Sequence, residues 1–208
     1  MRTAPLAFIK TDLPPHFAKG IEQLRASSSP DAKAQLDDVL GARAAIRVIV
    51  EGEGEAWIKV DQGALTAGDA RPDGVPVRAA IHVDAAAARE ALGVLESSGR
   101  MQEEKGPLRF ARMFSARVEK MLDGQKLEFH VVIKDVPDHD GDVVIKVGIG
   151  TDTPPAKPQF SAALSYDDLE DLREGDLTPQ QLIGRLRLTG DASRAMALGM
   201  MLMQPPKK

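Results

Sequence analysis

The chain has 208 residues, with 27 basic and 31 acidic side chains and a formal net charge of −4. This balance argues against a sequence-wide surface for nucleic acid or acidic lipid. Because the chain contains no cysteine, disulfides, thiolate metal sites and a cysteine nucleophile are excluded. A chain that is 43% hydrophobic and 28% charged is typical of a folded protein. No apolar run approaches the ~18 residues of a membrane span, and no targeting segment is recognised, so we expect a cytoplasmic protein.

The first half predicts helices, then three strands, then a helix. Apolar residues at helical spacing indicate helices over residues 17–24 and 32–40. Short apolar runs bounded by turn residues predict three strands, which are Ile46–Val50, Trp57–Val60 and Val77–Val83. A helix over Ala85–Leu95 is expected to follow.

The second half is expected to begin with the same order of elements, a helix and then three strands, and to add further elements after them. Pro107 suits the first turn of a helix, and apolar residues at alternate positions predict strands at Leu127–Ile133, Val143–Ile149 and Phe160–Tyr166. Asp140-Gly141 is a strong turn signal between the first two of these strands. The remaining expected elements are a short helix after Asp167, a strand at Gly184–Gly190 and a helix at Ala192–Met203 capped by Asp191.

Two segments of the first half recur in the second half. Ala56–Gly63 is similar to Val143–Gly150, and Val77–Asp84 is similar to Phe160–Asp167, in the same order. We therefore predict an incomplete duplication, because the first half has no counterpart of Leu177–Met203. The incomplete copy would leave a strand edge open, which could join the two copies in one sheet or pair two chains.

The end of the chain resembles the sterol carrier protein type two family. The resemblance rests on Glu174–Gln181, on the run Gly-Arg-Leu-Arg-Leu-Thr-Gly at Gly184–Gly190, and on Ala195–Leu198. It covers about Pro107 to Met203. It implies an α/β fold of the α+β type, with a mainly antiparallel five-stranded sheet covered on one face by helices and an incomplete second copy. The expected domains are residues 1–100 and 101–208.

The resemblance also implies a function without catalysis. Members of the family hold sterols, fatty acyl chains, acyl-CoA or isoprenoid lipids in an apolar tunnel, for carriage or presentation. No cofactor, metal or catalytic residue is expected. The residues expected to line the tunnel are Phe110, Phe114, Phe129, Val131, Ile145, Val147, Leu164, Leu186, Leu188, Met196, Met200 and Met203. A methionine-rich wall adapts to ligands of varied outline, although the same pattern also fits an ordinary filled core.

The sequence is also compatible with other functions, which would have different partners. A filled core would make the protein a structural or interaction module, with a second copy or another protein as its partner. An enzyme ranks third, because no nucleophile and base occur at a recognisable spacing. The acidic runs Glu51–Glu55 and Asp138–Asp142 are interpreted as hairpin turns rather than phosphate or metal sites. No nucleic acid is expected, and the basic helix face of Arg109, Arg112, Arg117 and Lys120 is the first surface to test for a transient membrane contact.

Overall fold

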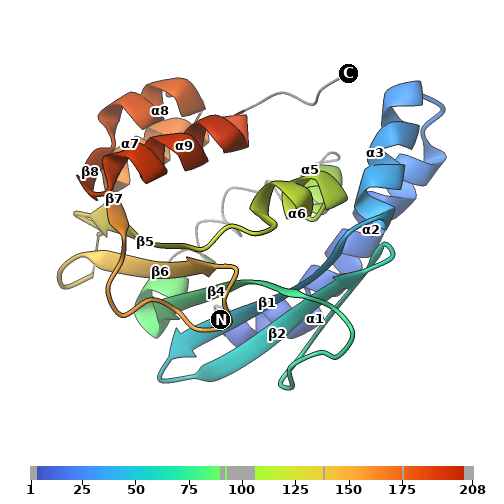
Figure 1. Cartoon of the computed structure of the whole chain (residues 1–208), viewed down its shortest axis with the longest axis horizontal. Helices are drawn as coiled ribbons and strands as arrows, with labels where there is room; N and C mark the ends of the chain where they lie inside the picture. Colours follow the sequence, from blue (N-terminus) through green and yellow to red (C-terminus); the bar gives the residue numbers. More distant parts are fainter. Residues whose placement is uncertain (1–3, 90–91, 93–105, 138, 175, 204–208) are drawn as a thin grey trace.

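Within the described residues, eight strands form one mixed sheet, with helices from both halves of the chain packed against it (Figure 1). The computed structural model describes residues 4–89, 92, 106–137, 139–174 and 176–203. The strands in chain order are β1 (Arg43–Glu51), β2 (Gly54–Asp61), β3 (Ala64–Gly68), β4 (Val77–Asp84), β5 (Leu127–Lys134), β6 (Val143–Ile149), β7 (Phe160–Ser165) and β8 (Arg187–Gly190). The labelled helices are α1 (Pro5–Thr11), α2 (Leu13–Ala26), α3 (Pro30–Leu40), α5 (Gly106–Met113), α6 (Ala116–Leu122), α7 (Tyr166–Glu174), α8 (Pro179–Arg185) and α9 (Ala192–Met203). The chain is α+β.

The predicted five-stranded, mainly antiparallel sheet is wrong. The described strands form a single sheet in the order β3-β2-β1-β4-β6-β5-β7-β8, in which the pairs β1–β4 and β5–β7 are parallel. The difference arises at the strand edge that the incomplete first copy was expected to leave unpaired. There β4 pairs antiparallel with β6, through Ala79 with Ile149 and Ile81 with Val147. This pairing satisfies the backbone groups of both edges and joins the two halves.

Sequence analysis also missed β3, because its short alternation of Leu65 and Ala67 lies between glycines. The helix expected after β4 begins as predicted, with the Asp84 carboxylate accepting a hydrogen bond from the backbone N–H of Ala87 at 2.8 Å. The expected domain boundary between residues 100 and 101 lies outside the described residues.

The two halves of the sheet repeat one pairing pattern. In the first half, Ile46 of β1 pairs with Ile58 of the antiparallel β2 and with Ala79 of the parallel β4. The second half makes the same arrangement around Val131 of β5, between the antiparallel β6 and the parallel β7. In both halves the first two strands form a hairpin, and a later strand, β4 or β7, pairs in parallel with the other edge of the first strand. The short strands β3 and β8 occupy the outer edges of the two units.

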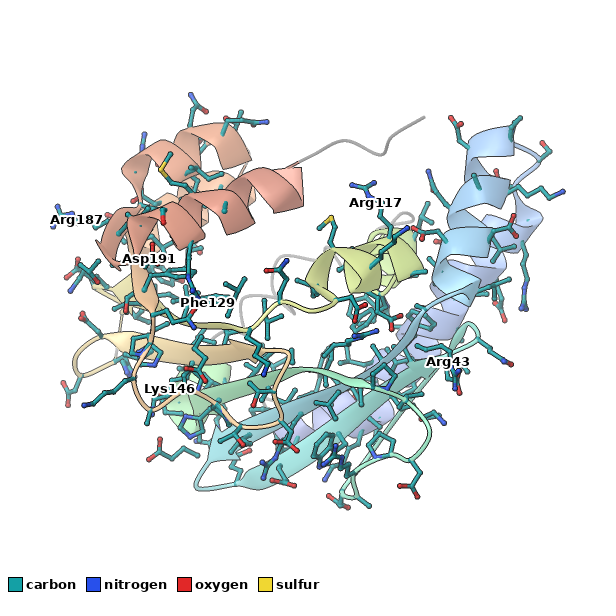
Figure 2. The ribbon with its side chains drawn as sticks, viewed as in Figure 1. Arg43, Arg117, Phe129, Lys146, Arg187 and Asp191 are labelled. Atoms are coloured by element: carbon teal, nitrogen blue, oxygen red, sulfur yellow. The ribbon has the colours of Figure 1, made fainter. Side chains whose placement is uncertain are left out.

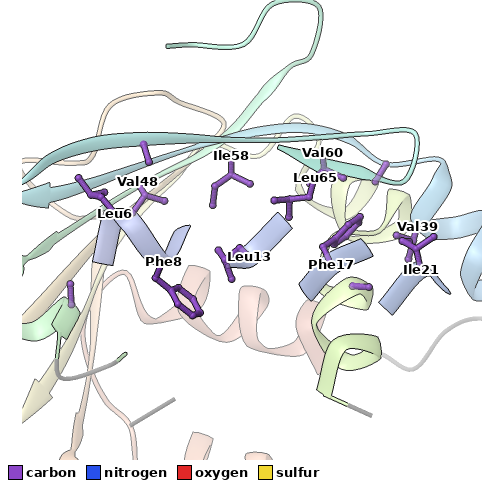
Figure 3. Close-up of a cluster of buried hydrophobic side chains, with 14 of the residues drawn as sticks. Leu6, Phe8, Leu13, Phe17, Ile21, Val39, Val48, Ile58, Val60 and Leu65 are labelled. Carbon is purple, nitrogen blue, oxygen red and sulfur yellow. The ribbon is translucent and has the colours of Figure 1, made fainter. Parts of the chain in front are cut away.

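Most of the described buried core lies in the first half. Apolar side chains of α1, α2 and α3 pack on the alternate residues of β1, β2 and β3 that face them (Figure 3). Phe17 of α2 is fully buried, and the rings of Phe110 and Phe114 meet it edge-on, with ring centres 6.5 and 5.9 Å away. Helix α5 therefore packs on α2, across the halves of the sequence. No helix in the described part of the chain is both long and apolar enough to cross a membrane.

The opposite face of the sheet is crossed by the loop between β6 and β7, residues 150–159. The backbone carbonyl of Asp152 accepts a hydrogen bond from Arg47 Nη1 at 3.0 Å, and its carboxylate pairs with Arg71 Nη1 at 2.9 Å. Both guanidinium groups lie against the Trp57 ring, 5.7 and 5.9 Å from its centre. These cation–π and polar contacts link the first-half hairpin to the second-half loop.

The loop also requires a small residue at position 148. A Cβ atom on Gly148 would lie 2.5 Å from Thr151 Cγ2 and 2.9 Å from the Thr153 carbonyl oxygen. We expect Gly148→Val to lower the free energy of unfolding by about 1–3 kcal/mol, since the loop must move off the sheet. Urea unfolding followed by circular dichroism measures the change.

The matched control is Gly68→Val in β3, where a Cβ would meet no heavy atom within 4 Å. Equal stability of the two variants would contradict the close contact between loop and sheet.

Candidate ligand-binding site

Alternate strand residues point to the same side of the sheet, and on one face these residues are apolar from Leu65 of β3 to Leu188 of β8. In the middle of this face Ile81 of β4 pairs with Val147 of β6, which also pairs with Phe129 of β5. Val131 lies two residues further along β5 on the same face, between Ile145 of β6 and Ala162 of β7. Figure 2 shows Phe129 on the helix side of the sheet and Lys146 on the other side.

The described buried side chains on this face gather in three clusters. The first is the large core under α1, α2, α3 and α5. The second centres on Leu127, Ile149 and Phe160, and the third on Ala87, Val136 and Val143. Between the second and third clusters lie Ile81, Val131 and Ala162, which we call the central strip. These three residues are half-buried, and they belong to none of the clusters formed by the described residues.

Six of the twelve predicted site residues share this face. They come from all four strands of the second half, and they are Phe129, Val131, Ile145, Val147, Leu164 and Leu188. Sequence analysis missed Ile81 and Ala79, which β4 of the first half adds to the same face. Their signal was the alternation in β4, but a sequence pattern does not show which strand becomes the neighbour.

The other predicted residues are placed differently. Phe110 and Phe114 pack against the first-half core, and Leu186 closes α8 as its C-cap residue. Helix α9 meets the sheet through Ala195, so the next residue, Met196, points aside and is 60% exposed. The side chains of Met200 and Met203 lie outside the described part of the structure.

A pocket of about 550 Å³ opens at the start of β5, next to the first turn of α9. We call it the β5 pocket. Among its lining residues are two cations, Lys126 and Arg194, and no carboxylate. Gln159 holds Arg194 in place by accepting a hydrogen bond from its Nη1 at 2.8 Å. The full lining is Gly124, Gln125, Lys126, Leu127, Gln159, Arg194 and Ala197.

Asp191 fixes the start of α9, as the sequence predicts. Its carboxylate accepts hydrogen bonds from the Ser193 hydroxyl and, at 3.2 Å, from the Arg194 backbone N–H. It also lies 3.3 Å from Arg194 Nε. The Ser193 hydroxyl and the Arg194 backbone N–H hold the pKa of the Asp191 carboxyl below its usual value.

An ion pair fixes helix α6, whose Leu122 packs against the second cluster. Glu119 accepts hydrogen bonds from Arg78 Nη2 and from the backbone N–H of Arg43, both at 2.7 Å. A small apolar pocket of about 60 Å³ lies beside this contact, with Ile46 and Ala79 in its lining. The ion pair therefore holds α6 over β1 and β4.

The remaining charged groups show mainly structural contacts. Asp142 of the predicted hairpin turn pairs with Lys134 at 2.8 Å, and Asp138 lies outside the described residues. A pocket of about 200 Å³ beside β7 holds Arg185, whose charge is paired with Asp168 at 2.7 Å. In the described part of the chain, no three acidic or histidine side chains are placed to hold a metal ion.

Comparison with known proteins gives no assignment. The chain matches no protein-family model and no curated protein.

The capping role of Asp191 predicts a pH-dependent loss of stability. We expect Asp191→Ala to be less stable than the native chain at neutral pH, because the N–H groups of the first turn of α9 lose their acceptor. Since the native pKa is lowered, this difference is complete above the usual value of 3.8 and disappears as the pH falls through the native pKa. Urea unfolding at a series of pH values measures it.

The control is Asp73→Ala, which removes an exposed carboxylate of the loop between β3 and β4. A difference for Asp191→Ala that grows in acid, or that equals the control at every pH, would contradict this role.

Proposed function

We propose that the protein binds a hydrophobic ligand with a single hydrocarbon chain on the central strip, for carriage or presentation and without chemistry of its own. The observation that carries the proposal is the half-buried state of Ile81, Val131 and Ala162 in the middle of an apolar face. Core side chains of a filled interior are normally close-packed on all sides. An apolar surface bordered by two helix groups is the usual setting for an apolar ligand.

The energy available from such binding is large. Burial of one methylene group contributes about 0.8 kcal/mol, so a chain of ~16 carbons gains on the order of 10 kcal/mol before ordering costs. The strip and its neighbours Phe129, Ile145 and Val147 offer aliphatic and aromatic contacts on four adjacent strands. Fatty acyl chains and isoprenoid chains fit this surface chemically.

The relationship to the sterol carrier protein type two family is part of this proposal. The relationship is supported by three segments that resemble the family's sequences, which are Glu174–Gln181, Gly184–Gly190 and Ala195–Leu198. We also propose that the protein works in the cytoplasm and collects its ligand by a transient membrane contact. The exposed Lys120 of α6 supports the proposed contact surface.

A substitution that fills the strip separates a ligand site from a filled core. We expect Val131→Trp to keep the native melting temperature within a few degrees and to abolish binding of cis-parinaric acid, because the indole occupies the place of the chain. Fluorescence titration measures binding, and circular dichroism measures stability. The matched control is Val132→Trp, the next residue of β5, which faces the opposite side of the sheet.

A filled core gives the opposite result. Overpacking by the indole would then cost about 1–3 kcal/mol of stability, and the native chain would bind no probe. That outcome would favour the alternative of a structural or interaction module and overturn the ligand site.

A further inference from the structure

The β5 pocket differs in charge from the rest of the molecule. The chain as a whole carries a net charge of −4, whereas the described lining of this pocket holds two cations and no carboxylate. Within the described residues no acidic side chain forms an ion pair with Lys126, whereas Arg194 Nε lies 3.3 Å from the Asp191 carboxylate. We propose that the pocket holds the anionic headgroup of the ligand, a carboxylate or phosphate attached to a single hydrocarbon chain. This inference rests on the proposed function.

Hydrogen bonds of Gln159 hold together the segments that line the pocket. Its side-chain oxygen accepts a hydrogen bond from Arg194, and its side-chain amide donates to the Lys126 carbonyl at 3.4 Å. One glutamine thus links the segments that carry both cations. The Gln159 carbonyl accepts a hydrogen bond from the Asp191 backbone N–H at 2.9 Å, which ties the start of α9 to the same residue.

A glycine allows this close approach. Gly190 has a φ of +83°, and a Cβ atom there would lie 2.4 Å from the Gln159 carbonyl oxygen. Only glycine adopts this backbone conformation without strain while leaving room for the carbonyl. The side of the pocket that carries Arg194 is therefore determined by the backbone, and the guanidinium is presented by a fixed helix start rather than by a free loop.

The pocket and the apolar face meet at Leu127. Leu127 lines the pocket, and it also belongs to the second cluster, against which Phe129 and Val147 pack. Val131 of the central strip follows Phe129 on the same face of β5. A ligand with its headgroup between the cations would therefore direct its chain along β5 towards the strip.

Three ligands with the same chain test the headgroup site. Isothermal titration calorimetry of the full-length protein with laurate, dodecyl phosphate and dodecanol separates charge from chain. We expect both anions to bind about tenfold more tightly than the alcohol. In Lys126→Gln and Arg194→Gln that preference should fall, and in the double variant it should disappear, while the affinity for dodecanol stays unchanged. Thermal unfolding of each variant verifies its fold.

Lys33→Gln is the matched control, because it removes the same charge from an exposed position of α3 outside the pocket lining. It should keep the full preference for anions. Equal binding of laurate and dodecanol by the native chain, or an unchanged preference in the double variant, would overturn the headgroup site alone. Binding of inorganic phosphate that is lost in the double variant, with no effect on laurate, would also overturn it. Failure of all three chains to bind would instead overturn the proposed function.

Discussion

The antiparallel pairing of β4 with β6 is the interaction on which the rest of the structure depends. It converts two small units into one sheet, with Ala79 to Ile149 and Ile81 to Val147 as paired residues. The helices of the first half then cover one end of the apolar face, and α7, α8 and α9 cover the other end (Figure 1). The strands at the junction lie between these helix groups, and Ile81 and Val147, which pair there, are only half-buried. The candidate site is a consequence of joining the halves.

Local patterns of the sequence predicted most strands because alternation and turn residues act within a few positions. The strands around Ile46, Val131 and Ala162 lie where apolar alternation places them, and Asp191 caps α9 as expected. The sheet itself could not be predicted in this way. Pairing of β4 with β6 brings together edges far apart in the chain, and an edge strand looks the same in sequence whether its partner is internal or another molecule.

The site was predicted in part for the same reason. Residues on one strand face, such as Phe129 and Val131, follow from a period of two, and the structure places them together. Phe110 and Met196 depend instead on how helices rotate and which neighbour they meet. Phe110 packs on the first-half core, and Met196 is exposed because Ala195 makes the helix contact. The Gly184–Gly190 run likewise divides between the end of α8 and the strand β8.

A polar pocket lies at the start of β5 and an apolar strip lies further along the same strand, and we propose that hydrocarbon occupies the strip. Methyl NMR of protein labelled at Ile, Leu and Val, with a spin-labelled stearate added, tests this claim most directly. The methyl signals of Ile81 and Val131 should broaden strongly, while those of Val132 and Val144 on the opposite face keep their intensity. Equal broadening on both faces, or no broadening at Val131, would contradict it.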